Sequence, residues 1–368
     1  MTLPLRADLH GIEPYGAPQL DVPVLLNVNE NPYPPPAAVI EDITTAVAAA
    51  AGGMNRYPDR DFEDLRGDLA AYLARESGAH DLTVANIWAA NGSNEVMLHL
   101  LQAFGGPGRT VLSFAPTYSM YPEYARDTLT DWVAGHRAED FTVSAASALA
   151  QIERVRPAVV LLASPNNPTG TALPLEVIEE IAHGTATTGP GGSASVIVVD
   201  EAYAEFRRSG TPSAVSIQHR FAHLAVARTM SKAFAFAGAR LGYLTAAPAV
   251  IDALRVVRLP YHLSAITQAV ARAALRHTDA LQAQVQALRT ERDATVTWLR
   301  DHGFTVADTD ANFVLFGLFD DRHAIWQGLL DRGVLIRETG PQGYLRVSIG
   351  TAEEMAAFRG ALKEVTGA

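Results

Sequence analysis

Five short, almost entirely apolar runs in the first two thirds of the chain constrain its fold more than any other feature. Segments with helical periodicity lie between them, for example Glu95–Phe104 and Leu175–Ala182. Strands that are apolar on both faces are typical of parallel sheets covered by helices on both sides. The sequence therefore predicts an α/β fold with a large, doubly wound domain and a mostly parallel sheet. The runs are Ile87–Ala90, Thr110–Phe114, Ala158–Ala163, Ser195–Val199 and His223–Arg228.

The pattern changes after about residue 253. A long helical pattern runs from Ser264 to Asp301, and three short apolar runs follow it, which favours a smaller α+β domain. We predict three parts: an N-terminal arm and small-domain segment (1–45), a large α/β domain (46–255) and a small α+β domain (256–368). The three late runs begin at Asn312, Gly333 and Tyr344.

Composition and charge exclude several classes of protein. The formal net charge is −11, which argues against nucleic acid or an anionic membrane as a partner. The absence of cysteine excludes disulfides, thiolate metal sites and a cysteine nucleophile. The N-terminal residues lack the apolar core of a signal peptide, and no apolar run is long enough to span a membrane. We therefore expect a cytoplasmic protein.

Lysine is rare in this sequence. Lys and Arg together number 29, yet the chain holds only two lysines, Lys232 and Lys363. Arginine stays charged at every accessible pH, whereas a desolvated lysine can lose its proton and form a Schiff base. Lys363 lies in an amphipathic helical pattern near the end of the chain and is expected on an exposed face. We therefore predict a chemical role for Lys232.

Polar residues follow each of the five apolar runs, at the sheet edge where open α/β folds bind ligands. Asn91-Gly-Ser-Asn-Glu95 leads into a helix, whose free N–H groups suit a phosphate. Tyr118 follows the next run and can stack on a flat ring. Asn167, in a turn with two prolines, can donate to a ring oxygen, and Asp200 ends a buried strand and needs a cationic partner.

The run that precedes Lys232 adds groups that bind anions. Thr229 and Ser231 supply hydroxyls, and Arg240 supplies a guanidinium fork eight residues after the lysine. Taken together, the strand ends offer a phosphate cradle, an aromatic ring, an amide donor, a carboxylate and one lysine. Pyridoxal 5′-phosphate would use all five.

Each of these features alone also has a simpler interpretation. The glycine-containing segment could be an ordinary capped helix start, Tyr118 a core residue, and the Asn167 segment an ordinary turn. Asp200 could form a structural salt bridge. Glu201 beside it leaves a metal site open, although no histidine or further carboxylate has suitable spacing.

The motifs together resemble those of the fold-type I pyridoxal-phosphate-dependent aminotransferases, and within them the histidinol-phosphate aminotransferases of actinobacterial type. The resemblance spans nearly the whole chain and no cofactor motif is interrupted. The matching segments are Asn29-Glu-Asn-Pro32, Arg56-Tyr57-Pro58, Asn91–Glu95, Pro116-Thr-Tyr118-Ser-Met120, Ser164–Gly170, Asp200-Glu-Ala-Tyr203, Thr229–Gly242, Arg258–Leu263, Gly333–Arg337 and Leu345-Arg346.

The resemblance implies specific roles around the cofactor. Lys232 would form the covalent link to pyridoxal 5′-phosphate and shuttle a proton, and Asp200 would pair with the ring nitrogen. Tyr203 and Asn167 would bind the ring oxygen, so the expected catalytic residues are Lys232, Asp200 and Tyr203, with no metal ion. The other expected cofactor contacts are Gly92, Ser93, Asn94, Tyr118, Thr229, Ser231 and Arg240, with Tyr57 supplied by the second subunit of an obligate homodimer.

The resemblance also implies where the substrate binds. Arg346 resembles the arginine that binds the α-carboxylate or phosphate of the amino substrate, and Tyr15, Asn29 and Arg337 resemble further substrate contacts. Without the resemblance, Arg337 and Arg346 would be expected on a solvated strand face. Tyr121, close to Tyr118, is a position where a change could alter substrate preference.

The implied reaction transfers the amino group of L-histidinol phosphate to 2-oxoglutarate, giving imidazole-acetol phosphate and L-glutamate in histidine biosynthesis. Three alternatives remain open from the sequence. The chain could be an aromatic amino acid aminotransferase, a threonine-phosphate decarboxylase, or a catalytically idle cofactor-binding or regulatory domain. The intact Lys232–Asp200 pair argues against the last of these.

Overall fold

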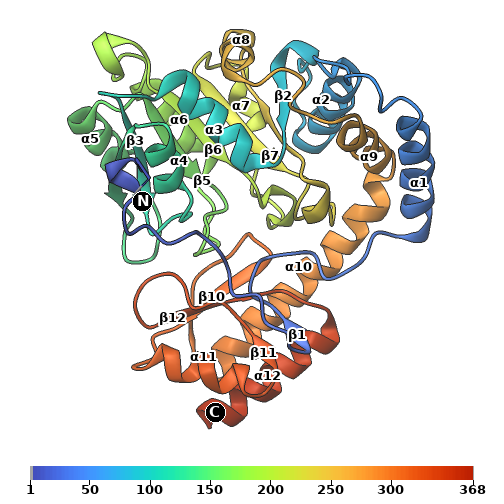
Figure 1. Ribbon diagram of the computed structural model, residues 1–368. Coiled ribbons are helices and arrows are strands. Elements are labelled where there is room, and N and C mark those ends of the chain that lie inside the picture. Colours follow the sequence, from blue (N-terminus) through green and yellow to red (C-terminus); the bar gives the residue numbers. More distant parts are fainter. Residues whose placement is uncertain (1–2, 368) are drawn as a thin grey trace.

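The computed structural model describes residues 3–367, and a seven-stranded sheet forms the centre of its larger part (Figure 1). Its strand order is β2-β8-β7-β6-β5-β3-β4, and only β8 runs antiparallel to its neighbours. Most residues of the central strands are fully buried, because helices cover the sheet. The strands are β2 (Ile87–Ala90), β3 (Thr110–Ala115), β4 (Asp131–His136), β5 (Val159–Ala163), β6 (Val196–Asp200), β7 (Leu224–Thr229) and β8 (Gly242–Thr245).

The five apolar runs are confirmed as strands, with ends within one residue of those expected, but two strands of the seven-stranded sheet were missed. β4 is an edge strand whose residues are mostly exposed, so it lacks the apolar character of the others. β8 has four residues and begins at Gly242, directly after the glycine-containing loop that follows Lys232. The doubly wound fold with a mostly parallel sheet is confirmed.

The helices of the large domain connect the strands. They are α2 (Glu63–Ser77), α3 (Ser93–Phe104), α4 (Tyr121–Asp127), α5 (Ala145–Val155), α6 (Leu175–Gly184), α7 (Val215–Gln218) and α8 (Pro248–Val257). α3 begins soon after the end of β2 and α4 soon after the end of β3, which places the N-termini of these two helices at the edge where the polar residues gather.

The smaller domain is built on short sheets and three helices. β10 (Phe313–Gly317) pairs antiparallel with β12 (Tyr344–Ser348) and β9 (Thr305–Val306). β11 (Val334–Leu335) pairs in parallel with β1 (Val24–Leu25), so the N-terminal segment becomes part of this domain. The expected smaller α+β domain is thus present, with helices α10 (Thr278–Asp301), α11 (Arg322–Leu330) and α12 (Ala352–Thr366).

The long helical pattern from Ser264 to Asp301 forms two helices rather than one. α9 (Ala265–Arg276) ends at His277, and α10 starts at the next residue. α9 packs on the large domain, where Arg272 pairs with Asp68 of α2 and Arg276 with Asp42 of α1 (Ala37–Ala51). We propose that the chain passes between the domains along α10, later than the boundary expected at residue 256.

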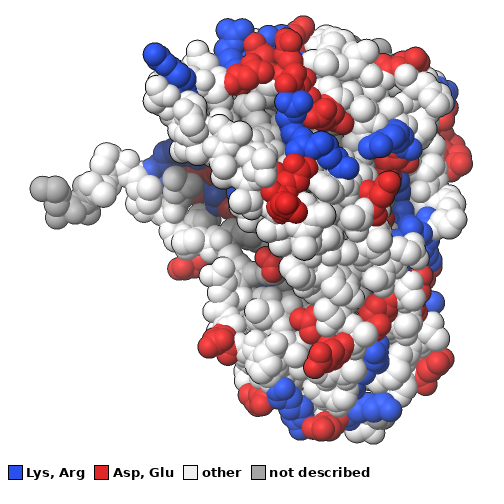
Figure 2. All heavy atoms as spheres, turned by 90° about the vertical axis from the view of Figure 1, so that its right-hand side faces the viewer, with Lys and Arg blue, Asp and Glu red and all other residues white. Residues whose placement is uncertain are grey.

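None of the helices formed by residues 3–367 combines the length and the apolar character needed to cross a lipid bilayer. Acidic and basic side chains are interspersed over the face of the molecule shown in Figure 2.

A buried cluster of charges fixes the loop after β6 against β7. Arg228 of β7 is inaccessible to solvent and bonds three carboxylates, at 2.8 Å to Glu201, 2.9 Å to Glu205 and 2.8 Å to Glu76. Its guanidinium also donates to the hydroxyl of Ser213 at 2.9 Å. Removing the cation alone would leave buried carboxylates without compensation, which is the costly way to break such a cluster.

We therefore predict that Arg228→Met lowers the free energy of unfolding by about 3–5 kcal/mol. The measurement is urea unfolding of the cofactor-free protein, followed by tryptophan fluorescence. Arg272→Met is the control, since Arg272 also bonds more than one carboxylate, Asp64 and Asp68, but is partly exposed. Arg272→Met should lower the free energy of unfolding by less than about 1 kcal/mol. Equal effects of the two substitutions would contradict the proposed importance of the buried cluster.

Candidate active site

A cavity of about 470 Å³ lies at the carboxyl ends of the large-domain strands, where the small domain and the N-terminal segment meet them. It gathers fourteen of the sixteen residues expected at the site. They are Tyr15, Asn29, Ser93, Asn94, Tyr118, Asn167, Asp200, Tyr203, Thr229, Ser231, Lys232, Arg240, Arg337 and Arg346. Of the other two, Gly92 adjoins the cavity beside Arg240, and Tyr57 does not line it.

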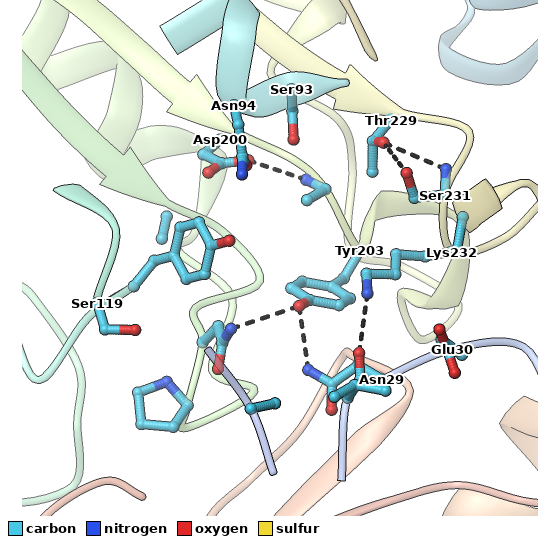
Figure 3. A pocket seen from close by; sticks show the side chains of 18 of the residues that line it. Asn29, Glu30, Ser93, Asn94, Ser119, Asp200, Tyr203, Thr229, Ser231 and Lys232 are labelled. Atoms are coloured by element: carbon cyan, nitrogen blue, oxygen red, sulfur yellow. Dashed lines mark hydrogen bonds between the residues drawn. The ribbon is translucent and has the colours of Figure 1, made fainter. Parts of the chain in front are cut away.

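Lys232 follows β7 and its side chain enters the cavity. Its Nζ donates a hydrogen bond of 3.0 Å to the backbone carbonyl of Val28, and in Figure 3 it points toward the segment that carries Asn29. Burial lowers the pKa of the Lys232 amine to about 8, and the nearby guanidinium of Arg346 acts in the same direction. A neutral amine is therefore accessible close to neutral pH, as a nucleophile or base requires.

Asp200 is the last residue of β6 and is buried at the base of the cavity. Its Oδ2 accepts a hydrogen bond of 2.9 Å from the hydroxyl of Tyr121, and its Oδ1 one of 3.2 Å from the backbone N–H of Ala202. Burial raises the pKa of the Asp200 carboxyl to about 6, against the effect of the Tyr121 hydrogen bond. No ion pair formed by residues 3–367 involves Asp200, so a cation that enters the cavity can pair with it.

The N-terminus of α3 forms one wall of an anion-binding corner. α3 starts at Ser93, and Gly92 before it has a φ of 92°, a conformation that strains other residues. A Cβ at Gly92 would lie 2.6 Å from a guanidinium nitrogen of Arg240. A side chain at Gly242 would also clash with the backbone of Ser93. Both glycines thus keep space at a helix end whose free N–H groups suit a phosphate.

The hydroxyls of Thr229 and Ser231 complete this corner. Thr229 donates to Ser231 Oγ at 3.0 Å, and the backbone N–H of Ser231 donates to Thr229 Oγ1 at 3.2 Å. Arg240 is exposed, and its only hydrogen bond recorded within residues 3–367 is from Nη1 to the carbonyl of Ala237 at 3.0 Å. Its remaining donors are available to an anion.

Tyr203 lies in the middle of the cavity with amide groups around its hydroxyl (Figure 3). The hydroxyl accepts hydrogen bonds from Asn29 Nδ2 at 3.0 Å and from Asn167 Nδ2 at 3.4 Å. Asn29 is fixed in turn because its Oδ1 accepts from Ser348 Oγ at 2.8 Å. The large domain, the small domain and the N-terminal segment therefore share one polar network.

Arg346 is a buried cation at the small-domain side. It donates to Asn167 Oδ1 at 2.6 Å and to the carbonyl of Asn27 at 2.9 Å, while its Nε has no partner among residues 3–367. Burial lowers the pKa of Arg346 to about 10, which still leaves it charged near neutrality. Its guanidinium lies 5.1 Å from the ring centre of Phe313. Arg346 is therefore buried rather than on a solvated strand face.

Arg337 and Tyr15 lie at the outer part of the cavity. Arg337 forms a β-bridge with Arg346 and donates to the carbonyl of Gly16 at 3.3 Å, and its Nη1 has no partner in the described part of the chain. Tyr15 accepts a hydrogen bond of 3.2 Å from Ser119 Oγ. Two guanidinium groups with free donors thus face the same cavity, which suits an anionic substrate.

Tyr118 and Tyr57 have different surroundings. Tyr118 lines the cavity, and its ring packs edge to face on Tyr121 with centroids 5.7 Å apart. Tyr57 is 80% exposed and stacks on Tyr261 with centroids 4.5 Å apart, outside the cavity. Glu201, considered above as a metal ligand, is instead bonded by Arg228 and by the hydroxyl of Ser213.

The sequence is matched over residues 22–362 by the family model for aminotransferase class I and II. The chain belongs to this family. A Thermobifida fusca protein named histidinol-phosphate aminotransferase is 60% identical over 365 residues, which cover 99% of this chain and 96% of that protein. A protein of the same name from Bifidobacterium longum is 58% identical over 373 residues, covering 99% of this chain and 96% of that protein.

Two solved structures show the same fold. Histidinol-phosphate aminotransferase from Sinorhizobium meliloti, in complex with pyridoxal-5′-phosphate, aligns with a TM-score of 0.80 and 26% identity, covering 94% of this chain and 91% of that one. A mutant of Thermus thermophilus aspartate aminotransferase aligns with a TM-score of 0.80 and 26% identity, covering 98% of each chain. This aminotransferase therefore has the expected fold-type I architecture.

Sequence reasoning missed two contacts of this aminotransferase. The Lys232 amine is held by a backbone carbonyl, that of Val28, which no side-chain motif can reveal. Tyr121 was considered only for substrate preference, yet its hydroxyl bonds Asp200. Its position three residues after Tyr118, at a helix start, is the one signal that could have indicated an inward direction.

The lowered pKa of Lys232 leads to a prediction for the cofactor-free protein. The rate of modification by trinitrobenzenesulfonate, followed at Lys232 by peptide mapping, should rise with pH with a midpoint near 8. Arg346→Gln should move this midpoint upward, because it removes a cation that disfavours the protonated amine. The rate of modification of Lys363, measured in the same samples, corrects for loss of the reagent. A midpoint near the ordinary value of 10.5 would contradict the lowered pKa of Lys232.

Proposed function

We propose that this aminotransferase uses pyridoxal 5′-phosphate to transfer the amino group of L-histidinol phosphate to 2-oxoglutarate. The observation that carries the proposal is 60% identity to a histidinol-phosphate aminotransferase over essentially the whole of both chains. The cavity supports it, since it combines an amine, a buried carboxylate and two separate groups of anion donors. The products would be imidazole-acetol phosphate and L-glutamate, in histidine biosynthesis.

The residues of the cavity fit this cofactor. The α3 N-terminus with Gly92, Ser93 and Asn94 would hold its phosphate, together with Thr229, Ser231 and Arg240. Asp200, which has no cationic partner among the described residues, would hold a proton on the ring nitrogen. Tyr203 and Asn167 would bind the ring oxygen, and Tyr118 would stack on the ring. When bound, the cofactor supplies an aldehyde that condenses with amines and a cationic ring that withdraws electrons.

Lys232 performs the proton transfers in this proposal. Its amine, with a pKa of about 8, can be neutral when it removes a proton from the substrate Cα and can return that proton to a neighbouring carbon. The carbonyl of Val28 lies 3.0 Å from Nζ and can hold the amine when it is protonated.

The arginines explain how one cavity accepts two different anions. Histidinol phosphate carries a phosphate, whereas 2-oxoglutarate and glutamate carry carboxylates. A guanidinium fork binds either group with parallel hydrogen bonds. Within the described residues, Arg346 has an unpaired buried Nε and Arg337 an unpaired buried Nη1, so both have donors that an incoming anion could use. Tyr15, exposed at the rim, and Asn29 complete the proposed substrate contacts.

The choice of substrate is tested by single-turnover experiments with the cofactor-loaded enzyme. We expect histidinol phosphate to bleach the cofactor absorbance at least about tenfold faster than phenylalanine or threonine phosphate, because it matches the anion site better. Lys232→Ala should slow the reaction by about a thousandfold or more, since it removes the acid–base group.

Each other outcome assigns a different function. Fastest bleaching by phenylalanine would make the protein an aromatic aminotransferase, and release of carbon dioxide from threonine phosphate would make it a decarboxylase. Failure of every amino donor to bleach the cofactor would indicate an idle cofactor-binding domain.

We also propose that the enzyme is a homodimer in which Tyr57 reaches the cofactor phosphate of the other subunit. Tyr57 is outside its own cavity and is 80% exposed on a surface with other exposed apolar side chains. Leaving such groups in water is unfavourable, so a second copy of the chain is expected to cover them. The other apolar residues are Met54 (64% exposed), Val256 (83%) and Leu259 (75%).

Subunit mixing tests this arrangement. Lys232→Ala and Tyr57→Ala homodimers should both have low activity. In a hybrid dimer, one site has Lys232 from one chain and Tyr57 from the other. Random pairing makes about half of the dimers hybrids with one complete site, so activity should rise toward about a quarter of the wild-type value. If mixing restores no activity, Tyr57 does not act on the partner's site.

A further inference from the structure

Tyr121 is a buried residue whose hydroxyl points toward Asp200. It is the first residue of α4 and is fully shielded from solvent. Its hydroxyl donates to Asp200 Oδ2 at 2.9 Å, the only side-chain hydrogen bond to Asp200 recorded within residues 3–367. A tyrosine in a core packs without needing to place its hydroxyl on a carboxylate, so this contact needs an explanation.

The surroundings of Asp200 show why the donor matters. Burial disfavours the charged form of the carboxyl, and the second contact is a longer bond of 3.2 Å from the N–H of Ala202. The other ionisable groups around it are the phenols of Tyr118, Tyr124 and Tyr203, and the carboxylate of Glu201, which Arg228 neutralises. Tyr121 is therefore the main group that favours the anionic form.

The segment that carries Tyr121 also positions Tyr118, the residue expected to stack on the cofactor ring. The backbone N–H of Tyr121 donates to the carbonyl of Tyr118 at 3.2 Å, and the two aromatic rings pack edge to face. Tyr118 lines the cavity, whereas Tyr121 lies behind it against Asp200. One short segment thus places both the side chain expected over the cofactor ring and the donor that fixes the acid.

We propose that Tyr121 is a positioning residue that keeps Asp200 ionised and turned toward the cavity, ready for the cationic ring nitrogen of the cofactor. This inference rests on the proposed function for the identity of the cation. It assigns to the hydroxyl of Tyr121 an electrostatic role that a phenylalanine of the same shape cannot perform.

The first test uses the cofactor-free protein. Asp200 has a folded-state pKa of about 6, above its ordinary value of 3.8, so its ionisation destabilises the fold as pH rises from about 4 to about 6. Tyr121→Phe removes a group that favours the anion and should extend this loss of stability to higher pH. The gap between the urea midpoints of wild type and variant should therefore widen as pH rises from 4.5 to 7.5.

Two further variants make this test specific. Tyr124→Phe also removes a buried hydroxyl, but one that makes no hydrogen bond to Asp200 in the described part of the chain, so the difference in urea midpoint should not change with pH. In an Asp200→Asn background, Tyr121→Phe should lose its pH-dependent effect, because no carboxyl remains to titrate. Should Tyr121→Phe not fold, Tyr121→Met, which also lacks a donor, provides the same comparison.

The second test measures cofactor affinity. A hydrogen bond to a charged group contributes enough that Tyr121→Phe should raise the dissociation constant for pyridoxal 5′-phosphate by roughly ten- to a hundredfold at neutral pH. The loss should be greater at lower pH, where the variant's Asp200 is protonated. Tyr124→Phe should stay within about twofold of wild type, because its hydroxyl makes no bond to Asp200.

The outcomes separate this inference from the proposed function. Wild-type affinity and an unchanged pH dependence of stability in Tyr121→Phe would overturn the role of Tyr121, even in an active enzyme. If wild-type protein bound no cofactor, the proposed function would fail, while the pH-dependent stability gap would still decide whether Tyr121 holds Asp200 ionised.

Discussion

The structure depends on keeping an amine and a carboxylate in one cavity without letting them neutralise each other. Lys232 and Asp200 follow or end adjacent strands, β7 and β6, yet each has a different partner. A direct ion pair would keep the amine protonated and would occupy the carboxylate, so that no other cation could pair with it. Instead, a neutral backbone carbonyl holds the amine and a phenol holds the acid. Burial then moves their pKa values toward neutrality, to about 8 for Lys232 and about 6 for Asp200, the latter against the effect of the Tyr121 hydrogen bond.

The two consecutive acids Asp200 and Glu201 have different surroundings because of the geometry of the strand end. Asp200 and Glu201 are neighbours in the sequence, but successive side chains at a strand end point to opposite sides. Asp200 therefore faces the cavity and Tyr121, whereas Glu201 faces the buried Arg228 and stabilises the fold. The sequence alone could not distinguish them, and a metal site remained possible until Glu201 was found already bonded to a cation.

Sequence patterns predict this fold well where burial is uniform. β5 and β6 are buried on both faces, so their apolar runs mark them clearly, and the polar residues after them indicate the binding edge. β4 was missed because an edge strand needs no apolar pattern, and the break at His277 was missed because the apolar periodicity continues across it. Hydrogen bonds to the backbone, such as that from Lys232 to the carbonyl of Val28, cannot be predicted from the type of the accepting residue.

The segment around residues 27–29 links the two charged ends of the cavity. The carbonyl of Val28 accepts from Lys232, the carbonyl of Asn27 accepts from Arg346, and the side chain of Asn29 bonds Tyr203. Asn29 is also tied to the small domain, where its N–H donates to Ser348 Oγ at 2.9 Å. Lys232, Arg346 and the small-domain residue Ser348 are therefore all bonded to the three consecutive residues 27–29. Since the same backbone segment bonds both Lys232 and Arg346, a movement of the small domain around a bound anion would also move the carbonyl that holds the Lys232 amine.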